Sequence, residues 1–207
     1  MTVDSGNTPP AGTAAPARPT SAAEARRSVI AIADALRREP ETTRERLGRP
    51  DAPAYPHDPT QTDLFLAMLQ DRLPVYVAIV ERLVASAGTG TVTGNLVPVA
   101  RATMDFWAEV LNAGITAFGS PETVMRLRTL LRGQGLGPQH TIAAVALYLR
   151  KEREAGRVPA TLDAAGTAQL LLGACLDQAF FELVLGEDLM PDREESAHRL
   201  AAALRLG

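Results

Sequence analysis

The sequence predicts an all-α protein, and three features of its pattern carry that prediction. Apolar residues recur at helical spacing through most of the chain. Prolines, glycines and helix-capping residues divide this pattern into segments of helical length. No segment of the sequence shows the sustained two-residue alternation that indicates strands. The connections are short, which favours antiparallel packing of neighbouring helices.

Composition is that of an ordinary globular protein. The chain has 207 residues, of which 46% are hydrophobic and 22% charged, so it can bury a sizeable core. The net charge of −3 disfavours a general nucleic-acid coat. The single cysteine, Cys175, excludes an intrachain disulfide, and the first residues lack the order of a secretion signal. We therefore expect a cytoplasmic protein with no membrane partner.

The amino-terminal third is expected to be only partly helical. Residues 1–22 have almost no large apolar side chain and are predicted to form a flexible tail. Ser21 and Glu24 are spaced as a capping box, which predicts a first helix that runs until Pro40. Between residues 40 and 60, Pro50, Pro53, Pro56 and Pro59 recur every three residues, which opposes a regular helix.

From Thr60 onward the helical pattern is continuous apart from short breaks. Thr60 is expected to cap a helix, in which Pro74 indicates either a kink or the start of a second helix. Glycines predict loops over 88–94 and 133–138. Further helices are predicted over 92–118, from Pro121 behind a Ser120 cap, over 139–155, from the Asp163 cap to residue 185, and after Pro191.

Large and polarizable side chains concentrate on these later helices, although only 4% of residues are aromatic. Long helices can enclose a ligand cavity between them, and plain core packing is the alternative. The candidate ligand-binding residues are Met104, Phe106, Trp107, Met125, His140, Tyr148, Cys175, Gln178 and Phe181.

Catalytic chemistry has weaker support. Asp105 and Glu109 are four residues apart and share one helix face, which suits either proton transfer or a solvated acidic stripe. His140, at the start of a helix, suits either a pocket edge or an exposed position. Asp177 and Cys175 are the remaining candidate catalytic residues. The three histidines lie far apart and GTGTVTG lacks the features of a phosphate loop, so we expect no metal and no cofactor.

Small residues in the last long helix allow a close approach of another helix. Gly166, Ala168, Gly173 and Ala174 lie within this predicted helix, and an apolar final helix follows it. We expect a homodimer of packed helix pairs, with a monomeric core as the alternative.

The carboxyl-terminal part of the chain resembles a known family. From about Asp63 onward, the sequence resembles the effector-binding and dimerisation domain of TetR-family transcriptional regulators. The resemblance is carried by the segment GLGPQHTIAAVALYLRKEREAGRVPATLDAAGTAQLLLGACLDQAFFELVLGE. This segment includes an E-x-x-x-G-R turn at 152–157. The resemblance implies a helical bundle that dimerises through its two last helices. It also implies a small, largely apolar organic ligand and an amino-terminal three-helix DNA-binding module.

That DNA-binding module is predicted to have eroded. Gly48, Tyr55 and His57 stand at the family's spacing, but Pro50 and Pro53, together with Pro56, occupy the place of the recognition helix. One interior proline costs a helix about 3 kcal/mol. We therefore expect domains 1–22 (tail), 23–60 (helix-turn-helix remnant) and 61–207 (ligand binding and dimerisation). The candidate DNA contacts are Arg44, Arg46, Arg49, Tyr55 and His57.

Three functions follow from this reasoning. The first is a TetR-like regulator, or a protein derived from one, that binds an apolar ligand and has weak or no DNA affinity. The second is a cofactor-independent enzyme that acts on a hydrophobic metabolite in the same pocket, because a fold does not determine a function. The third is a working repressor whose proline-broken segment still enters DNA.

Overall fold

The structure, a computed structural model, describes residues 23, 24, 26–28, 30, 31, 59–115, 121–133 and 137–206. Within these residues the fold is all-α, as predicted, with no strand. The described residues from 23 to 31 are helical, which confirms that much of the predicted first helix. The predicted tail and the proline-rich segment up to residue 58, with its candidate DNA contacts Arg44, Arg46, Arg49, Tyr55 and His57, lie outside the described residues. The next helix begins at Pro59, one residue before Thr60, so the expectation that Thr60 caps it is wrong.

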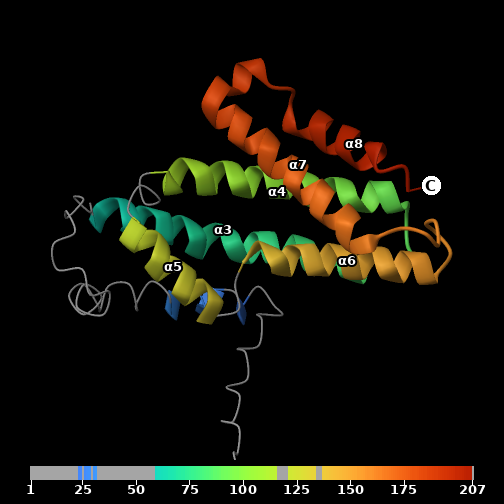
Figure 1. Ribbon diagram of the computed structural model, residues 1–207, viewed down its shortest axis with the longest axis horizontal. Helices are drawn as coiled ribbons and strands as arrows, with labels where there is room; N and C mark the ends of the chain where they lie inside the picture. Colours follow the sequence, from blue (N-terminus) through green and yellow to red (C-terminus); the bar gives the residue numbers. More distant parts are fainter. Residues whose placement is uncertain are drawn as a thin grey trace, which may run out of the picture.

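Six helices make up the main body. Figure 1 shows α3, α4 and α6 running along the long axis of the molecule, with α7 crossing α4 obliquely. Helix α8 packs on α4. Helix α4 also packs against α3 and α7, and so does α6. The elements are α3 (Pro59–Ala85), α4 (Val92–Gly114), α5 (Pro121–Gly133), α6 (Pro138–Glu154), α7 (Ala164–Leu185), the 3-10 turn η2 (Glu187–Leu189) and α8 (Arg193–Ala203).

Side-chain caps explain where several helices begin. The Asp163 carboxylate accepts from the backbone N–H groups of Ala165 and Gly166, both at 3.1 Å, and thereby caps α7 as predicted. Thr91 caps α4 by accepting from the N–H of Gly94 at 3.0 Å. Gly94 therefore lies in the first turn of α4, and the preceding loop ends earlier than its glycines predicted. Helix α4 itself ends at Gly114 rather than at residue 118.

Helix α3 is a single helix of 27 residues with Pro74 inside it. The structure thus decides against a second helix that starts at this proline. Pro74 lacks the N–H that would bond one turn back. The helix runs on because its apolar face is buried on both sides of the proline, at Leu69 and Tyr76.

The main core surrounds α4. Leu96, Ala100 and Met104 have no exposed surface, and they belong to one apolar cluster with Tyr148 and Leu171. A smaller cluster of Phe65, Leu66, Leu69, Val110 and Leu127 joins α5 to α3 and α4. Fully burying one such large apolar side chain contributes roughly 1.5–3 kcal/mol.

A buried carboxylate joins the end of α6 to the loop between α3 and α4. Glu152 is fully buried and accepts from the Gly88 backbone N–H at 2.9 Å and from Nε of Arg157 at 2.6 Å. Arg157 in turn donates to the carbonyl oxygens of Gly88, Thr89 and Gly90. Gly88 adopts a φ of 84°, a conformation that favours glycine. The E-x-x-x-G-R turn at 152–157 therefore acts as a clamp between two chain connections.

Helix α7 is the described helix that is long and apolar enough to cross a membrane by length and composition. Its Ala168, Leu171 and Cys175 are buried in the main core. A core helix passes the same test, so one such helix is weak support for a membrane span.

The clamp predicts a large effect for a small substitution. Glu152→Gln keeps the shape of the side chain but removes its charge, which leaves Arg157 without its carboxylate partner. We expect the free energy of unfolding to fall by roughly 2–3 kcal/mol, measured by urea denaturation. Glu109→Gln is the matched control, because Glu109 forms an exposed ion pair with Arg72, and it should cost less than about 1 kcal/mol. Equal effects of the two substitutions would contradict the role of the clamp.

A candidate ligand cavity

A cavity of about 340 Å³ lies between α3, α4, α5, α6 and α7. Its volume is within the range of roughly 300–1,000 Å³ that is usual for small-molecule sites. Most of its lining is aliphatic or aromatic, with a few polar side chains. Its aromatic lining residues are Phe65, Tyr76, Phe106 and Trp107, and its polar ones are Thr103, His140, Thr141 and Gln169.

Helical periodicity selects the residues that line the cavity. On α4 they are Thr103, Phe106, Trp107 and Val110, a stripe with spacings of three and four residues. On α7 the stripe is Gln169, Leu172, Gly173 and Leu176. Each helix therefore presents one strip to the cavity and keeps its other faces for packing or solvent.

The aromatic rings of α3 and α4 form a continuous wall. Tyr76 and Phe106 are stacked, with ring centroids 4.7 Å apart and an angle of 4° between the rings. Phe106 meets Trp107 edge to face at 6.0 Å. Such ring pairs contribute about 0.5–1.5 kcal/mol beyond the area they bury, so the wall is expected to be rigid.

Polar groups gather where α3, α4 and α6 meet. The hydroxyl groups of Tyr76 and Thr103 are 2.9 Å apart, and the Thr103 hydroxyl donates to the Val99 carbonyl oxygen at 2.7 Å. Burial raises the pKa of Tyr76 above its ordinary value, and hydrogen bonding by Thr103 and Thr141 opposes that rise. The Tyr76 hydroxyl therefore remains protonated at neutral pH.

The cavity brings together part of the predicted ligand site. Phe106, Trp107 and His140 line it. His140 lies in the first turn of α6, behind Pro138, and its backbone N–H donates to the Gly137 carbonyl oxygen at 3.1 Å. Its Nε2 atom is 3.4 Å from Nε2 of Gln139.

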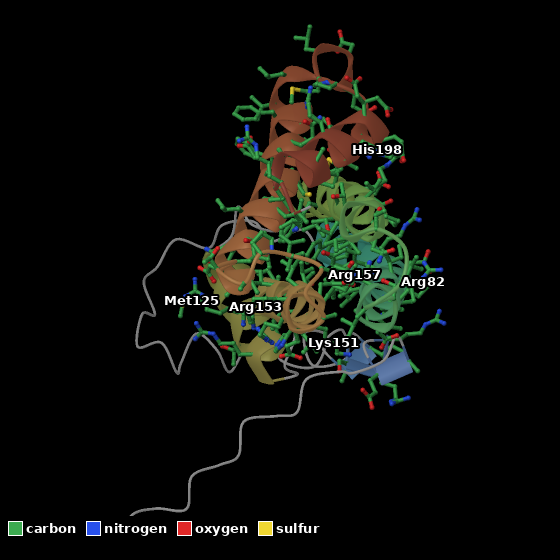
Figure 2. All side chains as sticks on the ribbon, turned by 90° about the vertical axis from the view of Figure 1, so that its right-hand side faces the viewer. Arg82, Met125, Lys151, Arg153, Arg157 and His198 are labelled. Carbon is green, nitrogen blue, oxygen red and sulfur yellow. The ribbon has the colours of Figure 1, made fainter. Side chains whose placement is uncertain are left out.

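The other predicted ligand residues lie away from the cavity lining. Met104, Tyr148 and Cys175 are fully buried in the main core, where the Tyr148 hydroxyl contacts the Asn95 amide at 3.1 Å. Gln178 is buried and donates to Glu182 and to the Pro191 carbonyl oxygen. Met125 and Phe181 are exposed, and Met125 projects from the outer side of α5 in Figure 2.

Helix α3 supplies lining residues that the sequence reasoning missed. Phe65, Leu69, Leu73, Tyr76 and Val77 face the cavity, and α5 adds its own aliphatic side chains. The spacing of these α3 residues was visible as an apolar stripe, but a stripe that faces a core and one that faces a cavity look alike. The aromatic residues Phe65 and Tyr76 within that stripe were the available signal.

The candidate catalytic carboxylates do not line the cavity. Asp105 is held by Arg101 and Arg193, at 3.0 Å each. Glu109 pairs with Arg72 at 2.8 Å, and Asp177 is exposed. Among the described residues, no group of three or more His, Cys, Asp and Glu side chains is arranged to hold a metal ion.

Arg193 is the centre of an ion-pair network that attaches α8. It also contacts Glu182 of α7 at 2.6 Å and Glu187 at 3.1 Å, and its hydrogen bond to Glu182 raises the pKa of Arg193. The Asp105 carboxylate therefore takes part in joining α4, α7 and α8.

Comparison with known proteins identifies no relative. No family model, no curated protein and no solved structure matches this chain.

Cys175 is predicted to be unreactive in the folded protein. Burial raises the pKa of its thiol to about 12, and only the thiolate attacks electrophiles. At about pH 8 a thiol-specific chromogenic disulfide should label the native protein far more slowly than the chain unfolded in guanidinium chloride. Cys175→Ser gives the background in both conditions. Rapid stoichiometric labelling of the native protein would contradict the burial of this thiol.

Proposed function

We propose that this chain is a TetR-like transcriptional regulator, or a protein derived from one, that binds a small, largely apolar organic molecule. The observation that carries the proposal is the cavity between five helices, apolar over most of its lining, with polar side chains at a few positions. Such a combination of apolar volume and few oriented polar groups is typical of small-molecule sites. The TetR resemblance of the sequence points to the same kind of ligand.

The size of the cavity limits the ligand. An apolar cavity of ~150 Å³ in another protein holds one benzene molecule. At about 340 Å³ this cavity has roughly twice that volume. It suits a molecule of about two fused or linked rings, or an aliphatic chain of similar volume.

Helix α3 provides the route from ligand to regulation. It contributes cavity residues from Phe65 to Val77, and its amino-terminal end at Pro59 directly follows the segment with the helix-turn-helix resemblance. Because α3 is one continuous helix, a ligand that favours one position of α3 also shifts the chain that precedes it. With DNA affinity weak or lost, this shift acts on a partner protein or accompanies storage of the ligand.

A homodimer is part of the proposal. Helix α7 and the turn that follows it expose large apolar side chains, including Leu170, Phe180, Phe181, Val184 and Leu189. Contiguous exposed apolar surface is typical of interfaces between proteins. The proposed dimer covers this surface by packing α7 and α8 against the same helices of a second copy, which makes the interface symmetric.

Ligand binding can be followed through Trp107, the only tryptophan in the chain, which lines the cavity. Tetralin, a two-ring apolar probe that absorbs little where tryptophan is selectively excited, should change Trp107 emission in a saturable way. Gly173 lines the cavity, and a Cβ atom added to it meets nothing within 4 Å. Gly173→Leu should therefore leave the fold of the single chain intact, occupy part of the cavity, and weaken tetralin binding about tenfold or more, since it removes buried ligand area. Because Gly173 also belongs to the small residues expected to face a second copy, the subunit number of the variant is measured beside its binding.

Gly133→Leu is the control for this experiment. Gly133 also has open space around an added Cβ atom, but it lies at the end of α5 and does not line the cavity. This variant should bind tetralin as the unchanged protein does. No saturable response, or equal loss in both variants, would count against a ligand site in this cavity.

A further inference from the structure

One hydrogen bond at the cavity wall has a direction that the structure determines. Thr103 has one hydroxyl hydrogen, and it is donated to the Val99 carbonyl oxygen at 2.7 Å, because a carbonyl oxygen can only accept. Thr103 therefore has no hydrogen left for Tyr76. In the 2.9 Å contact between these two hydroxyl groups, Tyr76 must be the donor.

This direction leaves Tyr76 with acceptor capacity only. Its single hydroxyl hydrogen points toward Thr103. Toward any other group, the Tyr76 oxygen can therefore only accept a hydrogen bond through its free lone pair. Thr141 also lines the cavity, and it lies close enough to the Tyr76 hydroxyl for hydrogen bonding that lowers the pKa of Tyr76. Where Thr141 donates its hydrogen to Tyr76, the Thr141 oxygen becomes the acceptor instead. In both cases this polar end of the cavity accepts a hydrogen bond.

The wall beside this acceptor consists of aromatic rings. Tyr76, Phe106 and Trp107 contribute adjoining rings from α3 and α4. A planar aromatic ligand can stack on or meet the edges of these rings, which an aliphatic chain of equal volume cannot do.

We infer that the cavity selects a planar aromatic molecule of about two rings that carries a hydrogen-bond donor, such as a phenolic hydroxyl or a ring N–H, over a molecule of the same shape with acceptors only. The ligand's donor group meets the acceptor end formed by Tyr76 and Thr141, and its rings lie along the aromatic wall. This inference rests on the proposed function, namely that the cavity binds a small apolar molecule.

Other polar groups in the cavity make a variant test necessary. His140 and Gln169 also line it, and an imidazole or an amide can both donate and accept. Selection by these two side chains would not depend on Tyr76 or Thr103. Substitutions at Tyr76 and Thr103 therefore separate the proposed acceptor from the rest of the lining.

The test compares three probes by calorimetry on the full chain: naphthalene, 2-naphthol and 2-methoxynaphthalene. Naphthalene reports the apolar cavity, 2-naphthol adds a donor, and 2-methoxynaphthalene has an acceptor only. We expect the unchanged protein to bind 2-naphthol about threefold to tenfold more tightly than 2-methoxynaphthalene, the range of one net hydrogen bond. Tyr76→Phe should abolish this preference and leave naphthalene binding nearly unchanged.

Thr103→Val is the matched variant, and it is expected to have the opposite effect on the Tyr76 hydroxyl to that of its removal in Tyr76→Phe. It removes the acceptor of the Tyr76 hydrogen and keeps nearly the same side-chain volume. The Tyr76 hydrogen is then free for the ligand or for Thr141, and a Thr141 hydroxyl that accepts from Tyr76 can itself donate to the ligand. In both cases binding of 2-methoxynaphthalene should strengthen and the preference for 2-naphthol should shrink or reverse. A purely structural role of Thr103 would weaken all three probes together.

The outcomes distinguish this inference from the function on which it rests. If naphthalene binds but the unchanged protein treats 2-naphthol and 2-methoxynaphthalene alike, the donor selection is wrong and the ligand cavity stands. A preference that persists in Tyr76→Phe also overturns the inference, because selection then does not depend on the Tyr76 hydroxyl but on other lining groups such as Thr141, His140 or Gln169. If none of the three probes binds, both the inference and the proposed function fail.

Discussion

The burial of α4 is the constraint on which the rest of the described fold depends. Leu96, Ala100 and Met104 are inaccessible to solvent, and α3, α7 and α8 all pack against this helix. Its cavity-facing strip, with Phe106 and Trp107, turns toward α5 and the start of α6. The main core and the cavity are therefore neighbouring faces of one helix, and movement of α4 would disturb both.

Two polar networks hold the other helices in register around α4. Glu152 and Arg157 fix the end of α6 to the loop that precedes α4. In the second network, Arg193 joins α8 to Asp105 of α4 and Glu182 of α7. Charged groups that resembled candidate catalysts or family motifs in the sequence thus have structural partners outside the cavity.

Helix boundaries were largely predictable because their signals are local. Asp163 and Pro121 mark helix starts through chemistry that involves only a few neighbouring residues. Pro74 was ambiguous, since whether a helix continues through a proline depends on burial of the flanking turns by other helices. Gly94 misled for a different and local reason, because the Thr91 cap places this glycine in the first turn of α4.

The cavity was predictable only in part because its lining depends on how helices are rotated against one another. Met104 and Phe106 are two residues apart, yet one is buried in the main core and the other lines the cavity. Their side-chain types predicted that both contact a ligand. Successive helical residues point about 100° apart, however, so the two side chains face different sides of α4. The same ambiguity hid Tyr76, whose role depends on contacts with Thr103 of α4 and Thr141 of α6.

Native mass spectrometry of the full chain, purified from its own host without denaturation, is the decisive measurement for the proposed ligand-binding dimer, because one spectrum reports subunit number and retained small molecules. We expect a dimer that carries additional mass from a small organic molecule, released on collisional activation. A monomer with no retained mass, together with no uptake of added naphthalene, would contradict the proposal.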